Sequence, residues 1–102
     1  MTLKLTGKQA RHLRALGHHL KPIMQIGKGG ISPEFLEKLD QALEQHELIK
    51  IKLLQNTMVD LDAAGEEISK ALHCYIAQKI GKTLMLYRMR KKDSRIPLPT
   101  EA

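Results

Sequence analysis

A short glycine-rich stretch with one lysine is the part of this sequence best suited to bind an anion. The stretch consists of Gly27, Lys28, Gly29 and Gly30. Glycine lets the backbone approach a ligand closely and adopt positive φ, and lysine supplies a mobile positive charge. Directly afterwards, Ser32 is suited to the N-cap of a helix, Pro33 to its first position and Glu34 to its first turn. The N–H groups and the positive dipole end of that helix would face the loop, which predicts a phosphate-binding site.

The spacing of these glycines is Gly-x-x-Gly, by which KH-type modules clamp the backbone of a nucleic acid. A connection between a strand and a helix also often contains glycine for turn geometry alone. The loop by itself therefore leaves two interpretations open, a clamp and a plain turn.

The distribution of charge favours a polyanionic partner. The 102 residues include 17 Lys and Arg but 11 Asp and Glu, which gives a net charge of +6. Residues 1–30 contain six basic residues and no acid, whereas residues 31–47 contain five acids and one lysine. Such asymmetry is typical of a nucleic-acid binder, although a basic soluble domain can also show it.

Length and composition predict a single domain in the cytoplasm. A chain of 102 residues can form one modest core, and its one cysteine, Cys74, excludes an internal disulfide. Residues 1–10 lack the apolar segment of a signal peptide, and no apolar run approaches the roughly 18 residues of a membrane span. An anionic membrane surface is disfavoured as a partner because the first helix needs its apolar face for the core. Nothing in the sequence requires more than a monomer.

The hydrophobic pattern predicts alternating helices and strands. Helices are expected at about residues 7–18 and 33–46, and a third helix from a cap at residue 60 or 62 to about residue 72 or 73. Strands are expected at about 21–26, 48–54, 75–80 and 84–89. Thr6 and Gln9 fit a capping box, and either Asp60 or Asp62 can cap the third helix. Residues 75–80 are ambiguous between a further helical turn and a strand, and we expect a strand in their second half because the turn at residues 81–83 joins it to residues 84–89 as a hairpin. The order αβαβαββ predicts an α/β two-layer sandwich with a mixed four-stranded sheet.

The first helix has an apolar face and a basic face. Its apolar arc is formed by Ala10, Leu13, Leu16 and Leu20. The opposite arc carries Lys8, Arg11, His12, Arg14, His18 and His19. A face that serves solubility alone usually mixes charges of both signs, so the absence of acids favours a binding surface.

Enzymatic motifs are incomplete in this sequence. Gly81-Lys82-Thr83 resembles the end of a Walker A loop, but position 76, which would need glycine, is Ile76. His46-Glu47 resembles the start of a zinc-protease motif, but the second histidine is replaced by Lys50. One cysteine and scattered histidines suggest no metal site, and Cys74 is more typical of a small buried hydrophobe. We therefore expect neither catalysis nor a cofactor.

Three stretches together resemble the CRM domain, and its small bacterial members of the YhbY type in particular. They are Ile26–Ile31, His46–Lys52 and Ile80–Arg88. The resemblance covers residues 1–92 and implies an RNA-binding domain followed by a flexible tail at residues 93–102. It also implies a fold similar to the C-terminal domain of translation initiation factor three, and association with ribosomal RNA in precursors of the large (50S) subunit. One departure is the absence of the glycine that usually precedes the third strand, where this chain has Leu72-His73-Cys74.

The charge pattern and the resemblance agree on a clamp for RNA without catalytic activity. The predicted RNA contacts are Gly27, Lys28, Gly29 and Gly30 in the loop, Lys8, Arg11, His12 and Arg14 on the first helix, Lys21 after it, and Lys82, Arg88 and Arg90 near the last strands. With one Phe, two Tyr and no Trp, the chain lacks residues for a multi-ring stacking platform, so we expect recognition of RNA shape and backbone.

Two alternatives remain. A sequence-specific DNA binder would need a recognition helix, but the helix after the loop is acidic. A protein-interaction module that docks on ribosomal or assembly proteins could use that acidic helix or the exposed sheet.

Overall fold

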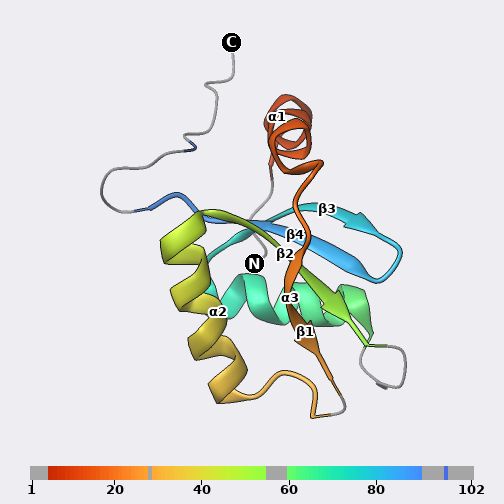
Figure 1. The fold of residues 1–102 in the computed structure, drawn as a ribbon, viewed down its shortest axis with the longest axis vertical. Helices are drawn as coiled ribbons and strands as arrows, with labels where there is room; N and C mark the ends of the chain where they lie inside the picture. Colours follow the sequence, from red (N-terminus) through yellow and green to blue (C-terminus); the bar gives the residue numbers. More distant parts are fainter. Residues whose placement is uncertain (1–4, 28, 55–59, 91–95, 97–102) are drawn as a thin grey trace.

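The computed structural model describes residues 5–27, 29–54, 60–90 and 96, and it contains the predicted elements in the predicted order (Figure 1). These are α1 (Gly7–Gly17), β1 (Pro22–Ile26), α2 (Pro33–His46), β2 (Leu48–Leu53), α3 (Leu61–Leu72), β3 (Tyr75–Ile80) and β4 (Thr83–Tyr87). Residues 75–80 form a strand throughout, which resolves their ambiguity. The element boundaries differ from the predicted ones by no more than two residues.

Each helix begins at a side-chain cap that the sequence indicated. The Thr6 hydroxyl accepts a hydrogen bond from the Gln9 N–H at 3.2 Å, and the Gln9 side chain accepts one from the Thr6 N–H at 3.1 Å. Ser32 Oγ caps α2 by accepting from the Phe35 N–H at 3.1 Å. Of the two candidates for α3, Asp60 is the cap and accepts from the Ala63 N–H at 3.0 Å. These bonds satisfy donors that a helix start otherwise leaves unpaired.

The four strands form one mixed sheet in the order β1-β2-β4-β3. β1 is parallel to β2, and the other neighbouring pairs are antiparallel. A parallel pair requires a crossover connection, and α2 supplies it. β1 and β3 are therefore the edge strands, and the glycine loop lies at the end of edge strand β1.

Helices cover both faces of this sheet. Gly65 of α3 approaches so closely that an added Cβ would lie 2.9 Å from Ile76 Cδ1. On α1, a Cβ added to Gly17 would lie 2.8 Å from Met85 Cε and 3.2 Å from Leu48 Cδ2. Because neighbouring residues of a strand point to opposite faces, these contacts place α1 on one face and α2 and α3 on the other. The predicted combination of three helices with a mixed four-stranded sheet is confirmed, and the helices lie on both faces of the sheet, with α1 opposite α2 and α3 (Figure 1).

The prediction that Leu16 belongs to the buried stripe of α1 is wrong. Leu13 is fully buried, but the Leu16 side chain is 42% exposed. The tight contact at Gly17 fixes which side of α1 meets the sheet, and Leu16 lies beside that contact. An apolar side chain is therefore left at the surface.

None of the described helices is long and apolar enough to cross a membrane.

His73 explains how the third helix ends without the usual glycine. It is the C-cap of α3 in the left-handed conformation, with φ 52° and ψ 51°. We expect His73→Gly to raise the free energy of unfolding by about 0.5–1 kcal/mol, because glycine adopts this conformation without a Cβ penalty. Urea denaturation of the wild type, His73→Gly and His73→Ala measures the effect. A glycine variant no more stable than the alanine variant would contradict it.

Candidate nucleic-acid interface

The glycine loop joins the end of β1 to the start of α2, as the sequence predicted. Gly30 has φ 68°, in the left-handed region that favours glycine, and its N–H donates to the Gly27 carbonyl at 3.0 Å. Gly29 is exposed, and a Cβ added to it would meet nothing within 4 Å. Lys28, the predicted cation of the loop, lies outside the described residues.

The first turn of α2 offers fewer donors to a ligand than the sequence suggested. Pro33 has no N–H, and the N–H of Phe35 donates to Ser32 Oγ. The N–H of Leu36 donates to the Ser32 carbonyl at 3.0 Å. A phosphate held here would therefore depend on the loop and on nearby cations more than on the helix terminus.

The glycine loop and the turn between β3 and β4 lie at the same end of the sheet, on either side of the end of β2. The Leu54 N–H donates to the Ile26 carbonyl at 2.9 Å, and the Leu53 N–H donates to the Lys82 carbonyl at 2.8 Å. The end of β2 thus connects the two segments. Exposed Lys52 and Lys82 line a hollow of about 400 Å³ at this end of the sheet. Two ammonium groups and the Gly-x-x-Gly backbone are suited to several phosphates of one strand.

Sequence reasoning missed Lys52 as a site residue. The signal was the alternation in β2, which places Lys50 and Lys52 on the face opposite Ile49 and Ile51. Lys50 also extends toward α1, where its Nζ donates to the His18 carbonyl at 3.3 Å. What the sequence did not specify was the pairing of β2 with β4, which brings Lys82 beside Lys52.

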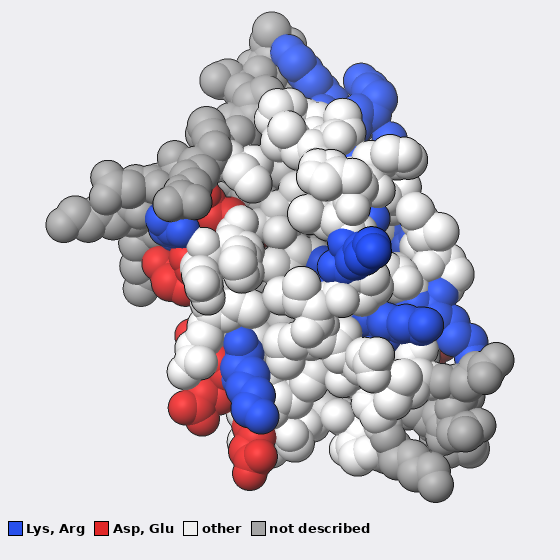
Figure 2. Space-filling model, viewed as in Figure 1, with Lys and Arg blue, Asp and Glu red and all other residues white. Residues whose placement is uncertain are grey.

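The sheet separates the charges of the described chain. α1 carries Lys8, Arg11 and Arg14 and no acid, and the four strands also contain no acid. The acids of the helices lie on α2 and α3, across the sheet from α1. Figure 2 shows blue side chains along the top and one side of the molecule, with the red ones gathered at α2. The α1 side is therefore a cationic surface. Basic groups also lie on the acidic side, namely Lys38, Lys70, Lys79 beside Asp62, and the guanidinium groups of Arg88 and Arg90.

The predicted basic residues fall at two ends of this surface. α1, with His12 among its exposed residues, packs over Leu48 at the start of β2, and the loop and Lys82 lie past Leu53 at its end. Exposed Lys21 lies between α1 and β1. A six-residue strand spans about 20 Å, so an extended ligand could contact both ends.

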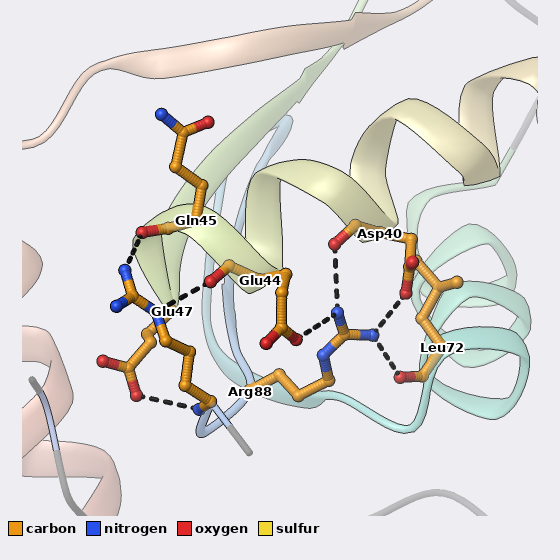
Figure 3. A network of polar contacts seen from close by, with 7 residues as sticks. Asp40, Glu44, Gln45, Glu47, Leu72 and Arg88 are labelled. Atoms are coloured by element: carbon orange, nitrogen blue, oxygen red, sulfur yellow. Dashed lines mark hydrogen bonds and ion pairs between the residues drawn. The ribbon is translucent and has the colours of Figure 1, made fainter. Parts of the chain in front are cut away.

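Arg88 is used inside the protein. Its guanidinium donates to Asp40 Oδ1 at 2.7 Å, to the Asp40 carbonyl at 3.0 Å and to the Leu72 carbonyl at 3.0 Å, and it lies 3.5 Å from Glu44 Oε1 (Figure 3). Arg90 likewise donates to the carbonyls of Glu44 and Gln45. Both guanidinium groups face α2, on the acidic side. Their assignment to RNA stays a prediction, and these bonds argue against it.

We expect Arg88→Met to lower the free energy of unfolding by about 2 kcal/mol, because it leaves the Leu72 carbonyl and the Asp40 carboxylate without a charged donor. RNA affinity of the folded variant should remain at the wild-type value. Lys82→Met is the matched control: Lys82 is exposed, so stability should change by less than about 0.5 kcal/mol while RNA affinity falls. Urea denaturation and RNA titration of both variants measure the two effects. Weaker RNA binding by the folded Arg88→Met variant would contradict this prediction and would show that Arg88 contributes to the RNA interface.

Glu47 is a buried acid that sequence reasoning did not single out. The residue is 1% exposed and has φ 65°, which is unfavourable for a side chain other than glycine. Its carboxylate accepts a hydrogen bond from the N–H of Arg90 at 3.0 Å, which Figure 3 shows, and another from the N–H of Ile96 at 3.1 Å. The Tyr87 hydroxyl donates to the Ile96 carbonyl. Ile96 is thereby fixed against the sheet, whereas the rest of the predicted tail, residues 93–95 and 97–102, lies outside the described residues.

The reactive side chains of the described residues form no site of their own. No group of three or more His, Cys, Asp or Glu among them could hold a metal ion. Cys74 is fully buried, and burial raises the pKa of its thiol to about 11. Near neutral pH it is therefore the protonated thiol, which is a weak nucleophile.

Comparisons with known proteins match this chain to one domain family and to proteins named as probable RNA-binding proteins. The model of the CRS1/YhbY (CRM) domain matches residues 5–88. The chain is 43% identical to the probable RNA-binding protein YqeI of Bacillus subtilis, over 93% of this chain and 99% of that protein. It is 33% identical to a probable RNA-binding protein of Pseudomonas aeruginosa, over 91% and 89% of the two chains. The solution structure of a hypothetical protein from Staphylococcus aureus superposes with a TM-score of 0.78 at 44% identity, covering 93% of this chain and 99% of that one.

Proposed function

Since the chain belongs to the CRS1/YhbY (CRM) domain family, we propose that it binds RNA without catalysing a reaction and that its target is ribosomal RNA in precursors of the large (50S) subunit, in the cytoplasm. The observation that carries the proposal is the meeting of the glycine loop, Lys52 and Lys82 at one end of an acid-free sheet. The names of the bacterial relatives support RNA as the ligand.

The proposed mechanism is a backbone clamp. Phosphates are held by the ammonium groups of Lys52 and Lys82 and by N–H groups of the loop other than that of Gly30, which donates to the Gly27 carbonyl. Lys28 adds a further charge. The basic residues of α1 and Lys21 extend the contact toward the other end of the sheet. Because phosphate neutralisation releases counterions, the logarithm of affinity should fall linearly with the logarithm of salt concentration.

A fluorescence-anisotropy titration tests the proposal. A structured fragment of large-subunit ribosomal RNA and an unrelated RNA hairpin of equal length are titrated with the protein at several salt concentrations. We expect salt-dependent binding of both RNAs and tighter binding of the ribosomal fragment. Equal affinity for the two would refute the ribosomal target but leave RNA binding intact. Absence of binding at low salt would refute the function itself.

A protein-docking role is a second candidate, favoured by the acidic surface of α2. Glu34 and Glu37 are exposed and could contact basic ribosomal proteins. Reversing both charges to lysine would weaken such a contact without weakening RNA binding. Reversal of charge in the glycine loop would have the opposite result, so the two variants separate the candidates.

A further inference from the structure

An apolar hollow of about 390 Å³ lies where the end of α1, the start of β1 and the end of α2 meet. Its walls are the aliphatic side chains of Leu16, Leu20, Ile23, Leu48, Ile49 and Ile96. His19, Lys21 and His46 complete the lining, which contains no acid among the described residues. The hollow is therefore apolar inside and basic at its edge.

The core does not use the two outermost wall residues. Leu16 is 42% exposed and Ile23 is 50% exposed, although both are large aliphatic residues beside a buried cluster. Neighbouring exposed aliphatic side chains around a hollow are typical of a binding surface. The lining also includes Ile96, whose backbone is bonded to the Glu47 carboxylate and the Tyr87 hydroxyl.

The hollow and the glycine loop are connected by one edge strand. β1 begins beside the hollow, at Pro22 and Ile23, and ends at Ile26, where the loop starts. Five residues of strand span about 17 Å, a distance that a short single strand of RNA could cover. Figure 1 shows β1 leading from the end of α1 to the loop, and Figure 2 shows uncharged surface between the blue and red side chains of that view.

We propose that this hollow binds one unpaired nucleobase of the RNA whose backbone the loop holds. The inference rests on the proposed function and adds to it a contact with a base. The aliphatic walls contact the faces of the base, Lys21 meets an adjacent phosphate, and the outer backbone groups of edge strand β1 are available to the polar edge of the base. The acid-free lining and the shared strand favour RNA over a protein segment as the occupant.

Two hexamers with the same number of phosphates isolate the contribution of the base. One is hexauridylate, and the other is a hexamer of abasic spacers. We expect the wild type to bind hexauridylate about tenfold more tightly, which is near the low end of what a base stacked on an aromatic side chain contributes, because the walls here are aliphatic. Leucine and isoleucine methyl NMR signals of Leu16 and Ile23 should shift with hexauridylate and not with the abasic hexamer.

Variants of the wall assign that difference to the hollow. The double variant Leu16→Gln, Ile23→Gln should reduce the tenfold ratio of hexauridylate affinity to abasic-hexamer affinity to about one, because each substitution replaces an apolar side chain of the wall with a polar amide. Met89→Gln is the matched control, since Met89 is 44% exposed and lines a different hollow beside Asp40 and Glu44. Gly29→Asp should weaken binding of both hexamers equally and leave the ratio unchanged.

The outcomes separate the two proposals. If the wild type binds both hexamers equally, or the wall variant keeps the tenfold ratio, the base-binding inference is overturned and the hollow is left to a protein partner, while RNA binding stands. If neither hexamer nor a structured RNA binds at low salt, the proposed RNA-binding function is refuted, and the base-binding inference is refuted with it. Circular dichroism and urea denaturation confirm that each variant is folded.

Discussion

Replacing Lys28 and Gly29 with aspartate is expected to weaken RNA binding by about 30-fold or more, which is about 2 kcal/mol of binding free energy. The double variant puts two carboxylates where the loop should meet phosphate. The fold should survive, because a Cβ on Gly29 meets nothing within 4 Å and Gly29 lacks the positive φ of Gly30. Anisotropy titrations across a range of salt concentrations should also show the salt slope falling by about one for each phosphate that the loop no longer neutralises.

The matched control is a second double variant that also lowers the net charge by three units, but on the acidic side of the protein. Lys38→Asp with Gln41→Asp alters two exposed residues of α2, opposite the cationic surface. Its RNA affinity should fall far less than that of the loop variant, because long-range repulsion is screened within about 10 Å at 0.1 M salt. Equal weakening in the two double variants would mean that net charge, and not the loop, holds the RNA.

Glu47→Gln is expected to lower the free energy of unfolding by about 2 kcal/mol. The two carboxylate oxygens accept from separate N–H groups, those of Arg90 and Ile96. A glutamine can accept with its one oxygen, but its NH₂ group would face the other N–H in a buried position. Urea denaturation measures the stability, and amide hydrogen exchange should become faster at Arg90 and Ile96.

Glu37→Gln is the control for the removal of one negative charge. Glu37 is exposed on α2, so its replacement should change stability by less than about 0.5 kcal/mol. A Glu47→Gln variant as stable as this control, with unchanged exchange at Ile96, would show that the buried carboxylate does not fix the segment. If Ile96 is released, the hollow beside Leu16 should also be open on one side.

The elements of the fold could be predicted from local signals. Thr6, Ser32 and Asp60 start helices because their side chains bond to N–H groups three residues ahead, which requires no tertiary contact. The turn at Gly81 is local as well, with φ 56°. His73 shows the limit, because its left-handed cap was not indicated by its residue type.

The candidate site could be predicted only in part. The glycine loop was found because its residue types and spacing have a local meaning. Arg88 and Arg90 looked like surface cations, but they bond to carbonyls of α2 and α3 that are distant in sequence. Glu47 was considered only as part of an incomplete zinc-protease motif, but its carboxylate accepts from two backbone N–H groups more than 40 residues away.

Local sequence signals were enough to specify the order of the elements, the family and the position of the glycine loop, because caps, hydrophobic periodicity and glycine spacing act over a few neighbouring residues. The tertiary structure decided which charges gather on one surface. Strand pairing brings Lys82 beside Lys52, and packing at Gly17 turns Leu16 outward. These outcomes depend on which faces of the sheet the helices cover, and that choice minimises exposed apolar surface over the whole chain rather than within any one segment.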